Sequence, residues 1–216
     1  MASIKKKQFT KMEMNARAMT RYRAVSYRLV TLLRHKAAKQ QLEVEETGWA
    51  RAEEILKTQF MKDLDTTWSD LEEVRKLDGK VDKQRLEFKV VNGTKCIRAL
   101  TGHSLEQVSQ EKIHGRSASK EEVAGAQHGT LKIYAQSIRQ HGLLKMGRNM
   151  IHLFLPVDDP KNVPKKSEVY FWVDTEAAIR DGHVFFRSSN NQVLTKGPLG
   201  PEYLAGPRDT PYPKGA

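Results

Sequence analysis

Three adjacent side chains that can bind an anion stand where a predicted helix ends: Arg34, His35 and Lys36, in the stretch VSYRLVTLLRHKAAKQQ. Upstream of them, apolar residues recur at the three- and four-residue spacing of one buried helix face: Ala18, Tyr22, Val25, Leu29 and Leu32. At about 100° per residue, Arg34 points away from that face and His35 lies to one side of it. They therefore face solvent or a site. A solvated helix end is the favoured explanation at this point, because cations there satisfy the last carbonyls and complement the helix dipole.

Basic residues are concentrated in the same part of the chain. Residues 1–39 hold eleven of the 37 Lys and Arg and one of the 26 acidic residues, whereas the rest of the chain is close to neutral. Such a local cationic surface attracts polyanions, of which nucleic acid is the commonest. For Lys5 to Lys11 alone, a disordered solubilising tail is an equally good explanation.

Composition limits the class of protein. A chain of 216 residues with 38% hydrophobic residues can form one large domain or two small lobes, and the change of pattern along it favours two lobes. No run approaches the roughly 18 apolar residues of a membrane span, and MASIKKKQFTKMEMNAR has no secretory apolar stretch. We therefore expect an intracellular protein, cytoplasmic or nuclear, with no membrane partner. The single cysteine, Cys96, excludes an intramolecular disulfide and occupies a predicted strand.

The N-terminal half reads as helices followed by a hairpin. The stretch TGWARAEEILKTQF has helical spacing, and WSDLEEVRKLDG predicts a further helix with Ser69 and Glu72 as a capping box and Gly79 at its end. Asn92-Gly93 between two alternating runs predicts a type I′ hairpin. This order is typical of a winged helix, a common nucleic-acid-binding module.

The C-terminal half is richer in strands. The polar stretch SQEKIHGRSASKEEVAG is the best linker candidate. After it, LKIYAQSIRQHGL predicts a helix that ends at Gly142, MIHLFL, SEVYFWVD and HVFFRSS predict strands, and TEAAIRDG predicts a short helix. The Pro- and Gly-rich end predicts an irregular tail.

Several kinds of chemistry are not supported. The chain has neither G-x-G-x-x-G nor a P-loop, and its histidines lack the spacing of zinc ligands, so we expect no metal. Four short motifs remain: RALTGHS from Arg98, QHGT at 127–130, GRNMIHL from Gly147 and FRSSNNQVLTKG from Phe186.

Together with LLRHKA, these motifs resemble, in the same order, those of the tRNA 2′-phosphotransferase family, over residues 26–203. Each motif alone is weak, but five in this order are strong support. The resemblance implies an enzyme that transfers an internal RNA 2′-phosphate, such as the splice-junction phosphate of ligated tRNA, to NAD. The expected products are 2′-hydroxyl RNA, nicotinamide and ADP-ribose 1″,2″-cyclic phosphate, formed through an ADP-ribosylated RNA intermediate.

The fold that the resemblance implies agrees with the pattern analysis. We expect an α+β protein with a basic flexible tail at 1–16, a winged-helix RNA-binding lobe at 17–104 and a linker at 105–124. An ADP-ribosyltransferase-like, NAD-binding mixed α/β lobe would follow at 125–204, with an irregular tail at 205–216. We expect a monomer.

The resemblance also assigns roles to individual residues. The catalytic group is expected to be Arg34, His35, Arg98 and Arg148, and planar guanidinium forks suit the nearly doubly charged phosphomonoester. Residues expected to bind NAD are His128, Gly129, Thr130, Gly102, His103, Ser104 and Asn190. Two of these also have structural explanations. Ser104 is equally a helix N-cap with Gln107, and both roles can hold at once; His128 could be a turn residue before a helix, although the surrounding motifs favour the site.

Two positions depart from the family pattern. Met150 stands where many members have a second histidine, and Asn191 stands where glycine is usual, although Asn tolerates left-handed backbone. Two alternatives remain open from the residues. One is an ADP-ribosyltransferase that caps nucleic-acid phosphates or modifies protein. The other is a non-catalytic winged-helix RNA-binding protein.

Overall fold

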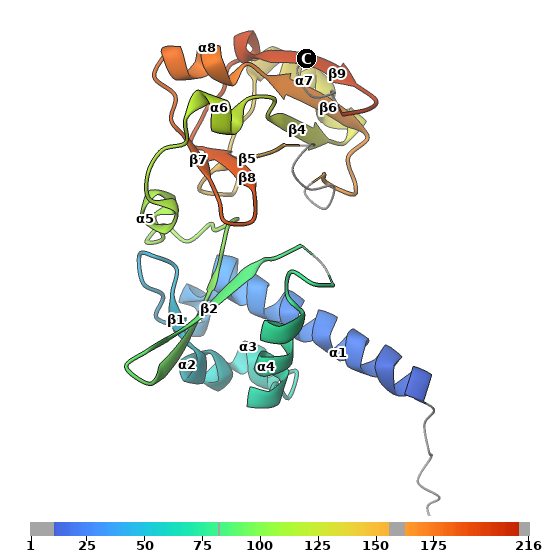
Figure 1. Ribbon diagram of the computed structural model, residues 1–216, viewed down its shortest axis with the longest axis vertical. Coiled ribbons are helices and arrows are strands. Elements are labelled where there is room, and N and C mark those ends of the chain that lie inside the picture. The colour runs from blue at the N-terminus through green and yellow to red at the C-terminus, as the bar shows by residue number, and fades with distance from the viewer. Residues whose placement is uncertain (1–10, 82, 156–162, 212–216) are drawn as a thin grey trace, which may run out of the picture.

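The computed structural model describes residues 11–81, 83–155 and 163–211 of the chain. Helices and strands surround two separate hydrophobic cores, one in each half of the sequence. Figure 1 shows the N-terminal half with its long helix at the bottom, the C-terminal sheet at the top, and the chain after β3 passing between them. With two antiparallel sheets and mixed helices, the fold is α+β, as the sequence predicts.

The N-terminal half is helical with a small sheet. Its helical elements are α1 (Lys11–Thr31), a π-helical turn η1 (Leu32–Lys36), η2 (Ala38–Gln40), α2 (Ala52–Lys57), α3 (Gln59–Lys62) and α4 (Trp68–Leu77). Its strands are β1 (Ala50–Arg51), β2 (Leu86–Val91) and β3 (Thr94–Ala99), in the order β1-β3-β2.

Helix α1 buries the predicted apolar stripe, including Tyr22, Val25 and Leu29. The helix begins at Lys11, inside the segment predicted as a tail. Residues 11–16 contain no Gly or Pro and continue the helix, so that prediction is wrong for them. For residues 1–10, the tail prediction lies outside the described residues.

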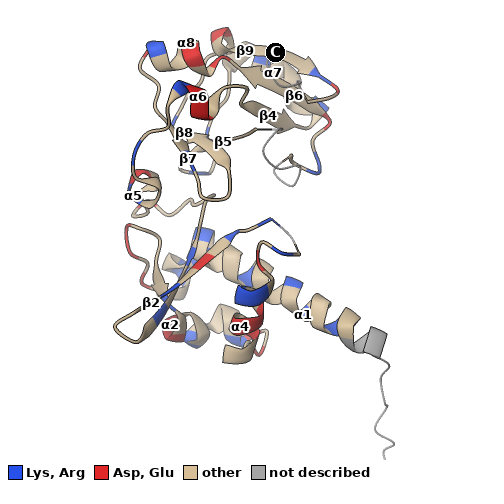
Figure 2. Ribbon diagram, viewed as in Figure 1, with Lys and Arg blue, Asp and Glu red and all other residues tan. Residues whose placement is uncertain are grey.

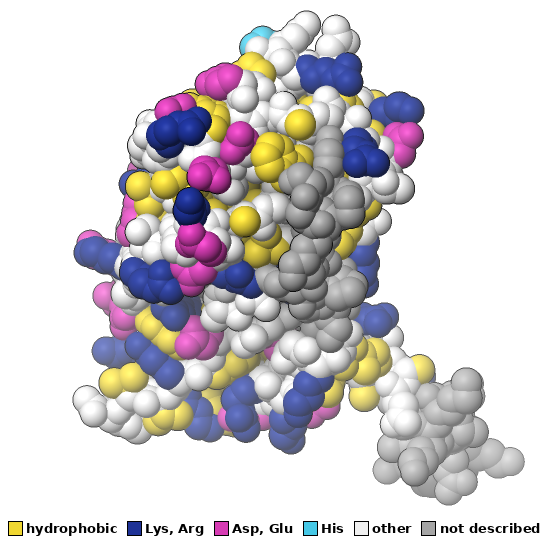
Figure 3. Space-filling model, turned by 45° about the horizontal axis from the view of Figure 1, so that its top comes forward, with side chains coloured by type: hydrophobic (Ala, Val, Ile, Leu, Met, Phe, Trp, Pro, Cys, Tyr) yellow, Lys and Arg dark blue, Asp and Glu magenta, His cyan; other side chains and the backbone are white. Residues whose placement is uncertain are grey.

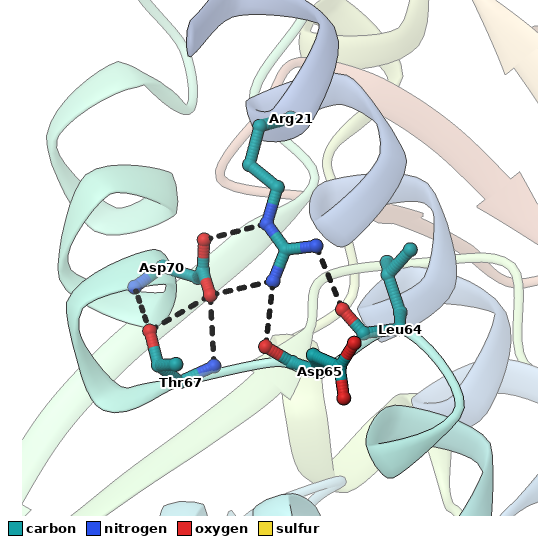
Figure 4. A network of polar contacts seen from close by, with 5 residues as sticks. All are labelled: Arg21, Leu64, Asp65, Thr67 and Asp70. Carbon is teal, nitrogen blue, oxygen red and sulfur yellow. Dashed lines mark hydrogen bonds and ion pairs between the residues drawn. The ribbon is translucent and has the colours of Figure 1, made fainter. Parts of the chain in front are cut away.

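Helix α1 is fastened to α4 by a polar network (Figure 4). The guanidinium of Arg21 donates to both carboxylate oxygens of Asp70 at 2.8 Å and to the carbonyls of Leu64 and Asp65 at 2.7 and 2.8 Å. Asp70 also closes a capping box with Thr67. The predicted box is therefore wrong by two residues, because the extended Thr67, not Ser69, precedes the helix.

The hairpin is confirmed, and one predicted helix is corrected. Asn92 and Gly93 have φ of 48° and 77°, as a type I′ turn requires. The predicted helix over TGWARAEEILKTQF is broken: its start pairs with β3 as β1, and Thr58 is extended and caps α3. Gly79, with φ of 82°, follows α4 as predicted.

The C-terminal half is built on one six-stranded antiparallel sheet in the order β7-β8-β5-β4-β6-β9. Its strands are β4 (Gln127–Thr130), β5 (Ile151–Phe154), β6 (Val169–Val173), β7 (Phe185–Arg187), β8 (Gln192–Thr195) and β9 (Leu204–Arg208). Its helical elements are α5 (Gln110–His114), α6 (Lys120–Val123), η3 (Lys132–Tyr134), α7 (Ala135–His141), α8 (Thr175–Arg180) and η5 (Pro201–Tyr203). The predicted helices before Gly142 and at TEAAIRDG, and the three predicted strands, are confirmed.

Two predicted irregular segments are ordered instead. The linker at 105–124 carries α5 and α6, and Val123 is fully buried in the second core. The tail predicted at 205–216 contributes β9, which pairs with β6 at the sheet edge. An edge strand has one neighbour and so tolerates proline, which explains why this Pro- and Gly-rich sequence still forms a strand. No helix in the described ranges is both long and apolar enough to cross a membrane.

Candidate active site

Two cavities meet at one arginine, Arg85, which precedes β2. The first, here called the sheet cavity, measures about 660 Å³. Its lining includes Lys83, Arg85, His128, Gly129, Arg148, His152, Phe154, Lys165 and Gln192. The second, here called the helix cavity, measures about 520 Å³ and is lined by Tyr22, Arg23, Ser26, Tyr27, Val30, Thr31, Arg34, His35 and Arg85. Among the residues that the structure describes, no acidic side chain lines either cavity.

Arg34 is a cation at this junction that is mostly, but not fully, buried. Burial is the main cause that lowers its pKa to about 10, and Arg148 and Arg85 lower the pKa further by repulsion. Its buried Nε atom has no hydrogen-bond partner among the described residues. Gly102, with φ of +85°, lies against the guanidinium, because an added Cβ would be 3.2 Å from Arg34 Cζ. A buried charge of this kind is strained until an anion neutralises it.

His35 lies beside Arg34 on the π-helical turn, a distortion often found at functional sites. Its Nδ1 is 2.9 Å from Ser104 Oγ, and the backbone N–H of Ser104 donates to the Arg34 carbonyl at 3.0 Å. Burial, Arg34 and Arg148 lower the pKa of His35, which favours the neutral imidazole. Ser104 thus holds His35 in place. It does not cap a helix, because residues 105–109 are not helical.

Arg85 is the residue that sequence reasoning missed. The carboxylate of Asp78 accepts hydrogen bonds from the backbone N–H of Arg85 at 3.1 Å and of Leu86 at 2.9 Å, which fixes the start of β2. The sequence DKQRLEFKV could have indicated this residue. Arg85 directly precedes the strand that, in the predicted hairpin, pairs with the strand ending in the RALTGHS motif. Leu86 is indeed paired with Ala99.

Arg98, in contrast to Arg34, Arg85 and Arg148, lines neither cavity. It is paired across the hairpin with Glu87, with 2.7 Å between Arg98 Nη2 and the carboxylate. Its Nη1 donates to the Thr47 carbonyl at 3.1 Å, and its guanidinium lies 4.6 Å from the centre of the Trp49 ring. Because Ile97 and Ala99 point into the core, Arg98 points to the opposite face of the strand.

Two histidines line the sheet cavity. His128 Nδ1 lies 3.2 Å from the His152 carbonyl, and His152 Nδ1 lies 3.1 Å from the Met150 carbonyl. Burial and then Arg148 lower the pKa of His152 to about 3, and burial also lowers the pKa of His128. Because a carbonyl accepts, Nδ1 of His152 is the protonated nitrogen. Its buried Nε2 is therefore an acceptor, and it has no partner among the described residues.

Gly129 also lines this cavity, within strand β4 rather than a turn. An added Cβ there would press on Ser167 and on Tyr170, at 3.1 Å from Tyr170 Cε1. Glycine is therefore required at position 129 because Ser167 and Tyr170 pack closely against the backbone of this strand. Thr130 pairs with Val169 at the end of the same strand and does not line the cavity.

The other predicted ligand-binding residues line neither cavity and have structural contacts. His103 is 1% exposed, its Nε2 is 2.9 Å from the Ala99 carbonyl, and burial lowers its pKa to about 4. Asn190 accepts from Ser188 Oγ at 2.6 Å and donates to the Gln84 carbonyl at 2.8 Å, which ties the β7–β8 turn to the residue before Arg85. Direct roles for His103 and Asn190 in binding NAD stay predictions.

The two departures from the motif pattern are accommodated. Asn191 has φ of 59°, so the left-handed turn is kept. Met150 is buried against Phe186 and Leu194, on the sheet face that also carries His152. Within the described ranges, no three His, Cys, Asp or Glu side chains are grouped to hold a metal ion.

The fold and this group of cations define an α+β protein with a cationic junction that can bind an anion. The chain belongs to the RNA 2′-phosphotransferase, Tpt1 / KptA family, whose sequence model matches residues 20–197.

Relatives come from fungi, bacteria and animals. The chain is 32% identical over 178 residues to the "Putative tRNA 2′-phosphotransferase" of Schizosaccharomyces pombe, covering 80% of this chain and 46% of that protein. It is 31% identical over 169 residues to the "Probable RNA 2′-phosphotransferase" of Fusobacterium nucleatum, covering 76% and 87% of the two chains. It is 29% identical over 181 residues to "tRNA 2′-phosphotransferase 1" of Danio rerio, covering 80% and 77%. The chain thus spans about half the length of the fission yeast relative.

Proposed function

We propose that this protein removes an internal 2′-phosphate from RNA, such as the splice-junction phosphate of tRNA, by transferring it to NAD as co-substrate. The products are 2′-hydroxyl RNA, nicotinamide and ADP-ribose 1″,2″-cyclic phosphate. The observation that carries the proposal is the position of Arg85 at the meeting point of two cavities, with Arg34 in one and Arg148 in the other. A phosphate held at Arg85 can be reached by one ligand through the sheet cavity and by a second ligand through the helix cavity.

The sheet cavity suits NAD. Lys83, Arg85 and Arg148 supply positive charge for the pyrophosphate, and the uncharged His128 and His152 line the same cavity. The unpartnered Nε2 of His152 can accept a hydrogen bond from a ribose hydroxyl. We assign the sheet half to an ADP-ribosyltransferase-like lobe, extended to include β9.

The helix cavity suits the RNA. It contains Arg34 and His35, and it runs along α1, where Figure 2 shows Lys and Arg at intervals. On the face drawn in Figure 3, basic side chains gather over the lower, N-terminal part of the molecule. We assign this half to a winged-helix RNA-binding lobe and propose that the protein acts as a monomer.

The chemistry follows from charge. The 2′-phosphate is already an anionic nucleophile, so the first step requires positioning more than a base. A phosphate oxygen attacks C1″ of the nicotinamide ribose, nicotinamide leaves, and the RNA becomes ADP-ribosylated. In the second step the ribose 2″-hydroxyl attacks phosphorus, and the RNA 2′-oxygen leaves as a hydroxyl. Charge grows on the phosphate in that step, where Arg34, Arg85 and Arg148 act, and the neutral His35 can carry the proton.

The experiment is one incubation with NAD and a short labelled RNA that has one internal 2′-phosphate. We expect dephosphorylated RNA and free nicotinamide. Stable ADP-ribosylated RNA would instead indicate a transferase that stops after the first step, and bound but unchanged RNA would contradict enzymatic function.

Arg85 and Arg98 provide a matched pair of variants for this assay. We expect Arg85→Ala to lower kcat/KM by roughly 100- to 1,000-fold, because it removes an electrostatic donor from the phosphate. Arg98→Ala, which removes the same group from the next strand, should stay within a few fold of the unmodified protein. The opposite order would place the catalytic arginine at Arg98 and contradict our assignment of Arg85.

A further inference from the structure

The helix cavity extends beyond the arginine junction along α1. Tyr22 and Ser26, each 1% exposed, lie at its base. Arg23, Tyr27 and Thr31 recur every four residues and therefore share one edge of the helix. The transfer chemistry requires the Arg34 end of this cavity and leaves the Tyr27 end without a role.

Tyr27 is unusual among the aromatic side chains of this half. Its side chain is 76% exposed, although α1 buries a continuous apolar stripe beside it. A cation lies over each of three neighbouring aromatic rings: Arg28 and Lys36 over Phe60, Lys89 and Arg98 over Trp49, and Lys95 over Trp68. In the part of the chain that the structure describes, no cation lies over Tyr27, and Arg23 one turn away forms no ion pair. Both groups are therefore available to a ligand.

We propose that the helix cavity is a subsite for the RNA nucleotide next to the one that carries the 2′-phosphate. The base of that nucleotide stacks on Tyr27, and Arg23 contacts the neighbouring phosphodiester. The inference rests on the proposed function, because it takes the ligand at Arg34 and Arg85 to be an RNA phosphate.

The spacing supports one nucleotide at each end of the cavity. Tyr27 and Arg34 are seven residues apart, or about 10 Å along the helix axis. Tyr27 is therefore too far away to share the phosphate held by Arg34, yet it lines the same cavity. An exposed aromatic ring beside a cation is the arrangement that binds single-stranded nucleic acid with little base preference, since every base has a stacking face.

The test compares two ligands and measures their dissociation constants. Adenosine 2′-monophosphate has no neighbouring nucleotide, whereas a trinucleotide with a central 2′-phosphate has two. We expect Tyr27→Ala to weaken trinucleotide binding roughly five- to a hundredfold and to leave adenosine 2′-monophosphate unchanged. Tyr27→Phe should bind both as the unmodified protein does, because the ring is kept. Arg23→Ala should lower the salt slope for the trinucleotide by about 0.7.

Tyr134→Ala is the matched control, since Tyr134 is also an exposed tyrosine, in the other half of the molecule. It should change neither dissociation constant. Unchanged trinucleotide binding by Tyr27→Ala would overturn the subsite, and so would an equal loss for both ligands. The proposed function is tested separately by turnover: if the trinucleotide binds through Tyr27 but is not dephosphorylated, the subsite stands and the transferase proposal fails.

Discussion

Replacing Arg34 by Gln is expected to stabilise the protein while it removes activity. The pKa of Arg34 is lowered from its ordinary value to about 10, first by burial and then by Arg148 and Arg85. A cation whose pKa is lower in the folded state destabilises that state at every pH below the folded pKa. The cost disappears only as pH rises from about 10 toward the ordinary pKa of arginine. At about 1.4 kcal/mol per unit, it is roughly 3 kcal/mol at neutral pH.

Glutamine retains part of the stem and a polar end but loses the charge. Lost packing of the stem offsets some of the gain, so we expect the free energy of unfolding to rise by about 1–2 kcal/mol and Tm by roughly 3–6 °C. Arg98→Gln is the matched control. It breaks the ion pair with Glu87 and uncovers Trp49, and it should lower stability by about 1 kcal/mol.

Thermal unfolding in buffer without phosphate or sulfate measures both variants. Adding adenosine 2′-monophosphate should raise the Tm of the unmodified protein more than that of Arg34→Gln, because the anion relieves the buried charge. An Arg34→Gln variant that is less stable than the unmodified protein without anion would refute the reasoning. It would mean that the protein itself already satisfies this guanidinium.

Two further predictions concern stability and pH. Because burial holds the pKa of His103 near 4, the folded state loses stability as pH falls below about 6.5. Between pH 7.5 and 5 this amounts to roughly 2 kcal/mol, and urea unfolding of His103→Gln should show a pH dependence smaller by that amount. Asp70→Asn removes the carboxylate that binds Arg21 and caps α4, and should cost about 2 kcal/mol at pH 7. Glu73→Gln, at the exposed pair with Lys76 on the same helix, should cost under about 0.5 kcal/mol in the same assay.

Local signals in the sequence predicted local structure well. The stripe on α1 depends on helical period alone, and the Asn92-Gly93 turn depends on two residues that tolerate positive φ. The break at Thr58 was missed because its neighbours keep a helical spacing while the chain pairs with β3 just upstream. Strand β9 was missed because its existence depends on β6, some thirty residues earlier, and not on its own composition.

The candidate site was predicted only in part, because sequence motifs are also local signals. Arg34 and Arg148 are in motifs that stand out in the sequence, and the structure brings both to the junction. Arg98 is in such a motif too, but it lies between buried Ile97 and Ala99, so its strand turns it toward Glu87. Arg85 reaches the junction through hairpin register and the Asp78 carboxylate, and neither is visible in a motif.

The repulsion among Arg34, Arg85 and Arg148 bears on substrate choice, if the proposed function holds. An RNA strand offers many phosphodiesters with one negative charge each, whereas a 2′-phosphomonoester carries nearly two. The carboxylate of Asp78, beside this group, is engaged by backbone N–H groups, and no acidic side chain within residues 11–81, 83–155 and 163–211 lines either cavity. The strain in the free site is therefore relieved most by the ligand with the highest charge. A cluster that is costly without an anion discriminates in favour of the dianion, which explains why the protein keeps an arrangement that lowers its own stability.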